Sequence, residues 1–226
     1  MAGKRKSLKL EDALLWYLVG LITSDGCLSS DGRHVDITAK DQNYLEALKR
    51  KIGILNKVGV KNRGERNQSY HLQISNIEFY EFLLSRGLSP RKSLILKEVM
   101  VPPTYFTDFC RGIIDGDGNI RRWTHPTNRG EQWVLRIYSA AKDFIVWLQG
   151  SIEPAFGATG RIHTEKKSGK RNDIYILKYG KMAAKRILKD CYYENATALD
   201  RKARLAQECC LSKACWTKSK TTVHLN

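Results

Sequence analysis

The chain has 226 residues, 42% of them hydrophobic, which suits one large domain or two small ones with a substantial core. Lys and Arg number 39 against 23 Asp and Glu, giving a formal net charge of +16. Such an excess indicates a polyanionic partner, with nucleic acid as the first candidate. A basic surface that only aids solubility is the alternative.

Several protein classes are disfavoured by what the sequence lacks. No CxxC pair occurs, and no His cluster stands at zinc-ligand spacing, so we expect reduced thiols. The N-terminal segment has no apolar stretch with a cleavage site, and nothing reaches the length of a membrane span. We therefore expect a soluble, intracellular protein, with its compartment left open. The cysteines are Cys27, Cys110, Cys191, Cys209, Cys210 and Cys215.

The first half predicts the order helix, two strands, helix, two strands, helix. An apolar helix over residues 10–24 begins beside Glu11 and Asp12, whose charges suit its positive end. The turn residues SSDG lie between the first two strands, and Asp41 caps a helix that ends at Gly53. The expected strands are 27–30, 33–39, 57–63 and 68–75, with further helices at 76–86 and 91–99.

A linker separates this half from the second. The two prolines of VPPTY, residues 101–105, cannot continue a helix. We place the N-terminal repeat at 1–100, the linker at 101–107, and the C-terminal repeat with its tail at 108–226. The first hairpin of the second half, around THPTNRGEQ, is expected to be the longer one.

The halves match each other in three blocks that recur in one order. LVGLITSDG at 18–26 returns as CRGIIDGDG at 110–118, and the block at 36–53, which contains TAKD, returns as the block at 137–153, which contains AAKD. The segment 70–96 corresponds to 175–206, which aligns Arg91 and Lys92 with Arg201 and Lys202. The predicted fold class is therefore α+β, built from two pseudo-symmetric αββαββα repeats.

The first repeated block predicts two helices packed against each other. Gly20 and Gly112 lie in mid-helix, where glycine costs about 1 kcal/mol relative to alanine unless another backbone approaches closely. Asp25 and Asp117 follow five residues later, so the pairing would bring two carboxylates to one end. In a polyanion-binding protein such a pair is suited to divalent metal and phosphodiester hydrolysis. The alternative is that each Asp-Gly only forms a turn, but its recurrence at equivalent places favours the metal site.

LVGLITSDG and CRGIIDGDG resemble the paired motifs of single-chain LAGLIDADG homing endonucleases, and the resemblance covers about residues 10–211. It implies a monomer whose saddle-shaped antiparallel sheets lie along a long double-stranded DNA site. It further implies cleavage of both strands with short 3′ overhangs. Mg²⁺ is the implied cofactor, with Mn²⁺ able to substitute and Ca²⁺ supporting binding without turnover.

The resemblance also implies site residues. Asp25 and Asp117 occupy the metal-binding position of each motif, and the carbonyls of Ser24 and Gly116 are implied as further ligands. Position six has Thr23 in one motif and Asp115 in the other, so we expect a helix-end or interface role for Asp115. Cys110 and Arg111 replace the usual Leu-Ala, and Ala39 stands where relatives often carry Gln, so that the polar residue is either displaced to Lys40 or absent.

Basic residues that stabilise developing negative charge are a further expectation. Lys92 and Lys202 are the first candidates, and Lys40 and Lys142, aligned in TAKD and AAKD, are the second. For each lysine the alternative is a solvated surface position.

DNA contacts are expected from the outward side chains of the strands, because apolar alternation assigns residues such as Val35, Ile37, Leu72 and Ile74 to the core. A register error of one residue would exchange the faces. The candidates are Arg33, His34, Asp36, Arg63, Arg66, Gln68, Gln73, Arg121, Arg122, Arg136, Arg161 and His163.

These residues favour a metal-dependent, site-specific DNA endonuclease, intron-borne or free-standing. The alternative is a non-cleaving protein of the same fold, such as an intron RNA maturase or a transcription regulator. A generic RNA-binding domain is a third, weaker reading because no RNP-like aromatic pattern occurs.

Overall fold

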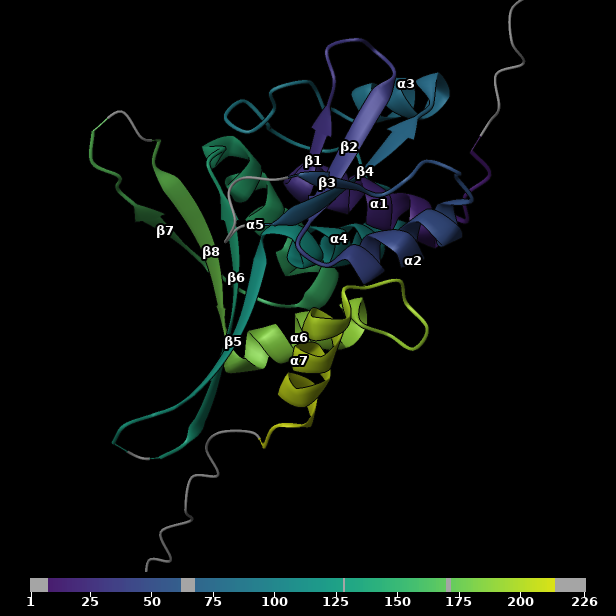
Figure 1. Cartoon of the computed structure of the whole chain (residues 1–226). Helices are drawn as coiled ribbons and strands as arrows, with labels where there is room; N and C mark the ends of the chain where they lie inside the picture. Colours follow the sequence, from purple (N-terminus) through teal and green to yellow (C-terminus); the bar gives the residue numbers. More distant parts are fainter. Residues whose placement is uncertain (1–7, 62–67, 128, 170–171, 214–226) are drawn as a thin grey trace, which may run out of the picture.

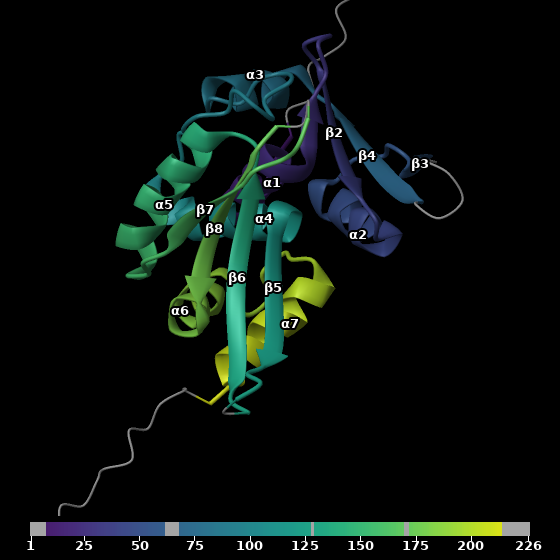
Figure 2. The same ribbon diagram turned by 90° about the vertical axis from the view of Figure 1, so that its left-hand side faces the viewer.

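The expected α+β architecture of two repeats is confirmed by a computed structural model, which describes residues 8–61, 68–127, 129–169 and 172–213. Two four-stranded antiparallel sheets lie beside a central pair of helices, α1 and α4 (Figure 1). Figure 2, turned by 90°, shows the second sheet facing the viewer, with α6 and α7 toward its lower end.

The first repeat consists, in chain order, of α1 (Asp12–Asp25), β1 (Gly26–Leu28), β2 (His34–Ala39), α2 (Gln42–Ile52), β3 (Gly59–Lys61), β4 (Ser69–Ser75) and α3 (Ile77–Ser85). Its sheet has the strand order β1-β2-β4-β3. Asp41 accepts a hydrogen bond from the Tyr44 amide at the start of α2, and Gly53 ends that helix in the left-handed conformation with φ 74°.

The second repeat consists of the 3₁₀ turn η1 (Pro103–Tyr105), α4 (Phe106–Asp117), β5 (Gly118–Thr124), β6 (Glu131–Ser139), α5 (Lys142–Phe156), β7 (Arg161–Glu165), β8 (Ile174–Gly180), α6 (Lys181–Cys191) and α7 (Asp200–Leu211). Its sheet repeats the order as β5-β6-β8-β7. The first hairpin is longer here, as expected, because β5 has seven residues where β1 has three.

The core confirms the predicted alternation of the strands. Val35, Ile37, Leu72 and Ile74 are fully buried in the first sheet, and Leu135 and Ile137 are fully buried in the second. Each sheet therefore turns one apolar face toward the helices and leaves its polar neighbours on the outer face.

The helix expected at 91–99 does not form. Residues 90–95 make a turn instead, in which the Ile95 and Leu96 amides both donate to the Lys92 carbonyl. Arg91 has φ 56°, a left-handed conformation that a helix cannot contain, and Leu94 and Ile95 are exposed. The expected linker is also shorter at its end, because α4 already begins at Phe106.

Strand register corrects one equivalence between the repeats. Gly26 pairs with Ile37 in the first hairpin and Gly118 pairs with Ile137 in the second, so Ile37 and Ile137 are equivalent. Lys40 then corresponds to Ala140, and Lys142 to Gln42. The alignment of TAKD with AAKD is wrong by two residues, because the shared letters A-K-D sit at different distances from the strand ends.

No helix in the described ranges is both long enough and apolar enough to cross a membrane.

Candidate active site

The site begins with the close packing of α1 against α4. A Cβ built at Gly20 would collide with the Phe109 carbonyl, and one built at Gly112 would collide with the backbone of Tyr17 and Leu21. The predicted role of both glycines is therefore supported by geometry: each removes a side chain where the partner backbone passes. This contact fixes the ends of the two helices side by side.

Gly26 and Gly118, which follow the two aspartates, allow the chain to pass from a helix directly into a strand. The Gly26 amide donates to the Ile22 carbonyl, and the Gly118 amide donates to the Ile114 carbonyl, while both residues are already extended. A Cβ at either glycine would overlap the helix it has just left, at Ile22 or Ile114. Each Asp-Gly step thus lets a strand follow the helix with no intervening loop.

Asp25 and Asp117 are brought together at this end. Asp25 is exposed and Asp117 is half-buried, and Cγ of Asp25 lies 3.3 Å from the place of a Cβ on Gly116. Desolvation raises the pKa of Asp117 to about 6, and the negative charge of Asp25 adds to that rise. Desolvation also raises the pKa of Asp25, against the opposing charges of Lys202, Lys92 and Arg201. The two carboxylates therefore repel each other at a place where burial reduces the access of water to Asp117.

The two predicted lysines approach these carboxylates from opposite repeats. Lys92 is 6% exposed and its Nζ donates to the Gly26 carbonyl at 2.5 Å. Lys202 is 2% exposed and its Nζ donates to the carbonyls of Ile114 and Asp115 at 2.6 Å and Gly116 at 3.0 Å. Burial lowers the pKa of both amines, to about 8 for Lys202. These lysines are not the solvated surface positions of the alternative reading.

The residues at the helix ends suit a divalent cation. Within the described ranges, no hydrogen bond or ion pair engages the Asp25 or Asp117 carboxylate, so their oxygens are free to bind a ligand. Carboxylate and backbone carbonyl oxygens are the ligands that Mg²⁺ prefers. No group of three or more His, Cys, Asp and Glu side chains forms a metal cluster in that part of the chain. A cation here would complete its shell with carbonyls, water and phosphate oxygens.

Asp115 has the interface role expected of it. It is buried and accepts hydrogen bonds from the Tyr17 hydroxyl at 2.8 Å, the Tyr192 hydroxyl at 2.7 Å and the Leu199 amide at 2.7 Å. The Thr23 hydroxyl, its counterpart, donates to the Val19 carbonyl within its own helix. The extra acid of the second motif therefore joins α1, α4 and the segment before α7.

A pocket of 740 Å³ opens beside Asp25 and is lined by Lys40, Tyr44, Asp115 and Arg201, among others. Lys40 thus lies near the carboxylates, whereas Lys142 is the exposed first residue of α5 and does not line this pocket. Arg201 was missed by sequence reasoning as a site residue, although the aligned RK pairs contained it.

The outer faces of the strands hold most of the expected DNA contacts. Arg122 is an exception: it shares the inner face with the buried Ile120 and pairs with Glu131 at 2.7 Å and Glu208 at 3.6 Å. Arg122 was expected on the outer face. A register error of one residue accounts for the difference, because it moves a side chain to the opposite face of the sheet. Lys178, between the buried Leu177 and Tyr179, was missed although the same alternation identifies it.

The other candidates divide into three groups. Arg33 and Gln68 are exposed residues that adjoin strands, and Arg63 and Arg66 lie outside the described residues. The residues on outer strand faces are His34, Asp36, Gln73, Arg121, Arg136, Arg161 and His163.

Comparisons with known proteins find one similar family model and several solved structures with a similar fold. The family model of the LAGLIDADG-like domain matches residues 12–86. No curated protein matches the chain in a sequence comparison.

Solved structures with this fold include the homing endonuclease I-WcaI bound to its DNA recognition sequence, at TM-score 0.60 and 12% identity over 91% of this chain and 88% of that one. Mesophilic variants of the homing endonuclease I-DmoI match at TM-score 0.56 and 16% identity, over 87% of this chain and 97% of that one.

Full-length DUF199/WhiA from Thermatoga maritima matches at TM-score 0.55 and 12% identity over 90% of this chain, which spans 62% of that longer chain. Residues 12–86 are thus similar to a LAGLIDADG-like domain, and the chain has a two-repeat fold similar to that of these homing endonucleases.

Proposed function

We propose that this protein is a site-specific double-strand DNA endonuclease that hydrolyses phosphodiester bonds with divalent metal and leaves short 3′ overhangs. The observation that carries the proposal is the juxtaposition of Asp25 and Asp117, two carboxylates without hydrogen-bond partners in the described structure, at the shared end of α1 and α4. A protein that only binds DNA gains nothing from two adjacent repelling charges facing a polyanion.

The chain's own residues have separate tasks in this proposal. Asp25 and Asp117 would hold the cations, with the Ser24 and Gly116 carbonyls as further ligands. When bound, Mg²⁺ activates water and stabilises charge on the phosphate and the leaving oxygen. Mn²⁺ is expected to substitute, and Ca²⁺ to support binding alone. Lys92 and Lys202 hold the backbone at both helix ends and place positive charge beside the reacting phosphates.

The DNA partner follows from charge and architecture. A net charge of +16 favours duplex DNA electrostatically, and the outer sheet faces offer Arg and Gln side chains that suit guanine and adenine. Because one chain supplies both helices of the central pair, we propose that a monomer binds a long target site.

Two observations favour a second candidate, a DNA-binding protein that does not cleave. Lys202 already donates to the Gly116 carbonyl, which is one of the proposed metal ligands. Ala39 also supplies no polar side chain beside Asp25. A protein of this kind would keep its function when the carboxylates are neutralised.

The test selects cleaved sites from a randomised duplex library in Mg²⁺ and bound sites in Ca²⁺. Asp25→Asn and Asp117→Asn are each expected to abolish double-strand cleavage while leaving the dissociation constant in the absence of metal within about threefold of wild type. Asp190→Asn, which neutralises an exposed acid on α6, is the matched control and should cleave normally.

Cleavage that survives both motif substitutions would reject the assignment. Specific binding without any cleavage in Mg²⁺ or Mn²⁺ would instead support the second candidate.

A further inference from the structure

The outer faces of the two sheets differ sharply in charge. In the second sheet, strand register places Asn119, Arg136, Lys178 and Arg161 in one row across all four strands. Arg121 lies two residues further along β5 on the same face. Lys178, Arg161 and Arg121 are exposed, and Arg136 is half-buried. This sheet therefore presents four cations on its outer face.

These four cations are not neutralised by the protein. In the part of the chain that the structure describes, none of them makes an ion pair or a side-chain hydrogen bond. Arg122 on the inner face, by contrast, is paired with Glu131 and Glu208. The charge on the outer face is thus available to a partner, whereas the charge on the inner face supports the fold.

The strands of the first sheet, as far as the structure describes them, have no such row. The places equivalent to Asn119, Arg136 and Lys178 are taken by Cys27, Asp36 and Gln73, which follow one another across β1, β2 and β4. Asp36 adds a negative charge and lies 3.4 Å from Nδ1 of His71. On the strands of this sheet the outer face has a single lysine, Lys61, whose Nζ donates to Thr38 at 3.0 Å.

We infer that the two sheets divide DNA binding unequally: the second sheet anchors duplex DNA electrostatically, and the first sheet contributes little affinity. The inference rests on the DNA-binding part of the proposed function, but not on cleavage.

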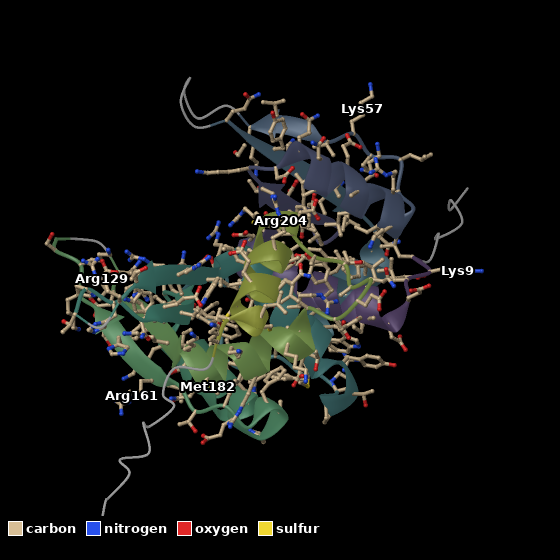
Figure 3. The ribbon with its side chains drawn as sticks, turned by 90° about the horizontal axis from the view of Figure 1, so that it is seen from below. Lys9, Lys57, Arg129, Arg161, Met182 and Arg204 are labelled. Carbon is tan, nitrogen blue, oxygen red and sulfur yellow. The ribbon has the colours of Figure 1, made fainter. Side chains whose placement is uncertain are left out.

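Dimensions support a duplex as the occupant. Neighbouring strands lie about 4.8 Å apart, so Arg136, Lys178 and Arg161 span about 10 Å before their side chains extend, close to the roughly 12 Å width of a major groove. On an unselected duplex, Arg136 and Lys178 on the central strands are placed to neutralise phosphates. Arg161 on the edge strand β7 is placed to reach a phosphate. Figure 3 shows Arg161 and Arg129 on the part of the molecule that holds the second sheet, well away from Lys57 of the first repeat.

The test measures binding of the full chain to an unselected DNA duplex in EDTA, by fluorescence anisotropy over a range of salt. Arg136→Gln/Lys178→Gln removes two cations from the row. Arg50→Gln/Lys189→Gln removes two exposed cations from α2 and α6 and is the matched control for net charge. Thermal melting of each variant checks that the fold is kept.

Each phosphate contact contributes about 0.9 to the slope of log K against log salt, so the row variant is expected to lose about 1.8 and the helix variant almost nothing. Asp36→Asn is the reciprocal change, and it is expected to tighten binding about two- to fivefold because it removes a charge that repels phosphate.

Three results would count against the inference. Equal slopes for the row variant and wild type, equal losses for both double variants, or weaker binding by Asp36→Asn would each overturn it. Because no metal is present, failure of the nuclease proposal leaves this test untouched. A wild-type protein that binds no duplex at all would overturn both proposals together.

Discussion

Gly20 and Gly112 determine how closely α1 and α4 approach. Alanine normally stabilises a helix interior by about 1 kcal/mol relative to glycine, but here its methyl group would meet the backbone of the partner helix. Because backbone atoms cannot rotate away, we expect Gly20→Ala to destabilise the protein by about 2–3 kcal/mol, the upper part of the range for overpacked cores. Urea unfolding measures this free energy.

Gly150 supplies the control for that prediction. It lies in α5, and a Cβ there would meet nothing within 4 Å. Gly150→Ala is therefore expected to stabilise the protein by about 0.5–1 kcal/mol. A Gly20→Ala protein as stable as Gly150→Ala would contradict the packing described for the helix pair.

At the residue scale, comparing one repeat with the other identified two pairs of residues that the structure brings to the central helices, although it wrongly paired Lys40 with Lys142. Gly20 and Gly112 recur at corresponding places and lie at the contact between the helices, and Lys92 and Lys202 recur likewise and donate to backbone carbonyls at the helix ends. Arg122 has no such partner in the first repeat, and the choice between two adjacent arginines depended on strand parity alone. The structure pairs Arg122 with the buried Trp133 on β6, and this register places Arg122 on the inner face.

At the scale of elements, Arg111 explains how the second motif holds the segment between α6 and α7. It is 1% exposed and donates to the carbonyls of Cys191 and Thr197 at 2.9 Å and to the Asp108 carboxylate at 2.7 Å. One side chain therefore ties α4 to the two ends of a loop. That loop leads directly to α7, which carries Lys202.

We expect Arg111→Met to destabilise the protein by about 3–5 kcal/mol, because it leaves the buried Asp108 charge without its partner. Amide hydrogen exchange should accelerate first over residues 192–199, whose carbonyl contacts are lost. Arg111→Met/Asp108→Leu should recover part of the stability, since the orphaned charge is gone. Unchanged exchange in this loop would contradict the bracing role.

Residues 91–99 were expected to form a helix and do not, which shows that an apolar pattern alone does not determine whether a helix forms. The sequence PRKSLIL is compatible with a helix, and its counterpart around Lys202 does form one, α7. In the first repeat, Arg91 instead adopts φ 56° and Lys92 turns inward to the Gly26 carbonyl. That long-range contact of a buried ammonium cannot be read from local sequence, because its acceptor lies 66 residues away.

At the scale of the whole molecule, the repeats are expected to unfold as one unit. The contact between α1 and α4 buries Tyr17, Leu21, Phe109 and Ile113, so neither repeat completes its core alone. The hydrogen bond from the Tyr17 hydroxyl to the Asp115 carboxylate also links the two repeats inside this interface. An interface made of core residues gives two repeats little independent stability.

Gly20→Ala and Gly150→Ala then test this coupling from opposite repeats. Hydrogen exchange followed by mass spectrometry through a urea series should report one midpoint for β2 and β6 in the wild type. Each substitution should shift both midpoints together, downward for Gly20→Ala and upward for Gly150→Ala, because each acts on a single cooperative transition. If β6 kept its midpoint while β2 lost protection in Gly20→Ala, the halves would be separate folding units joined by a weak contact. The carboxylates of Asp25 and Asp117 would then have no common rigid support, since each is positioned by its own helix.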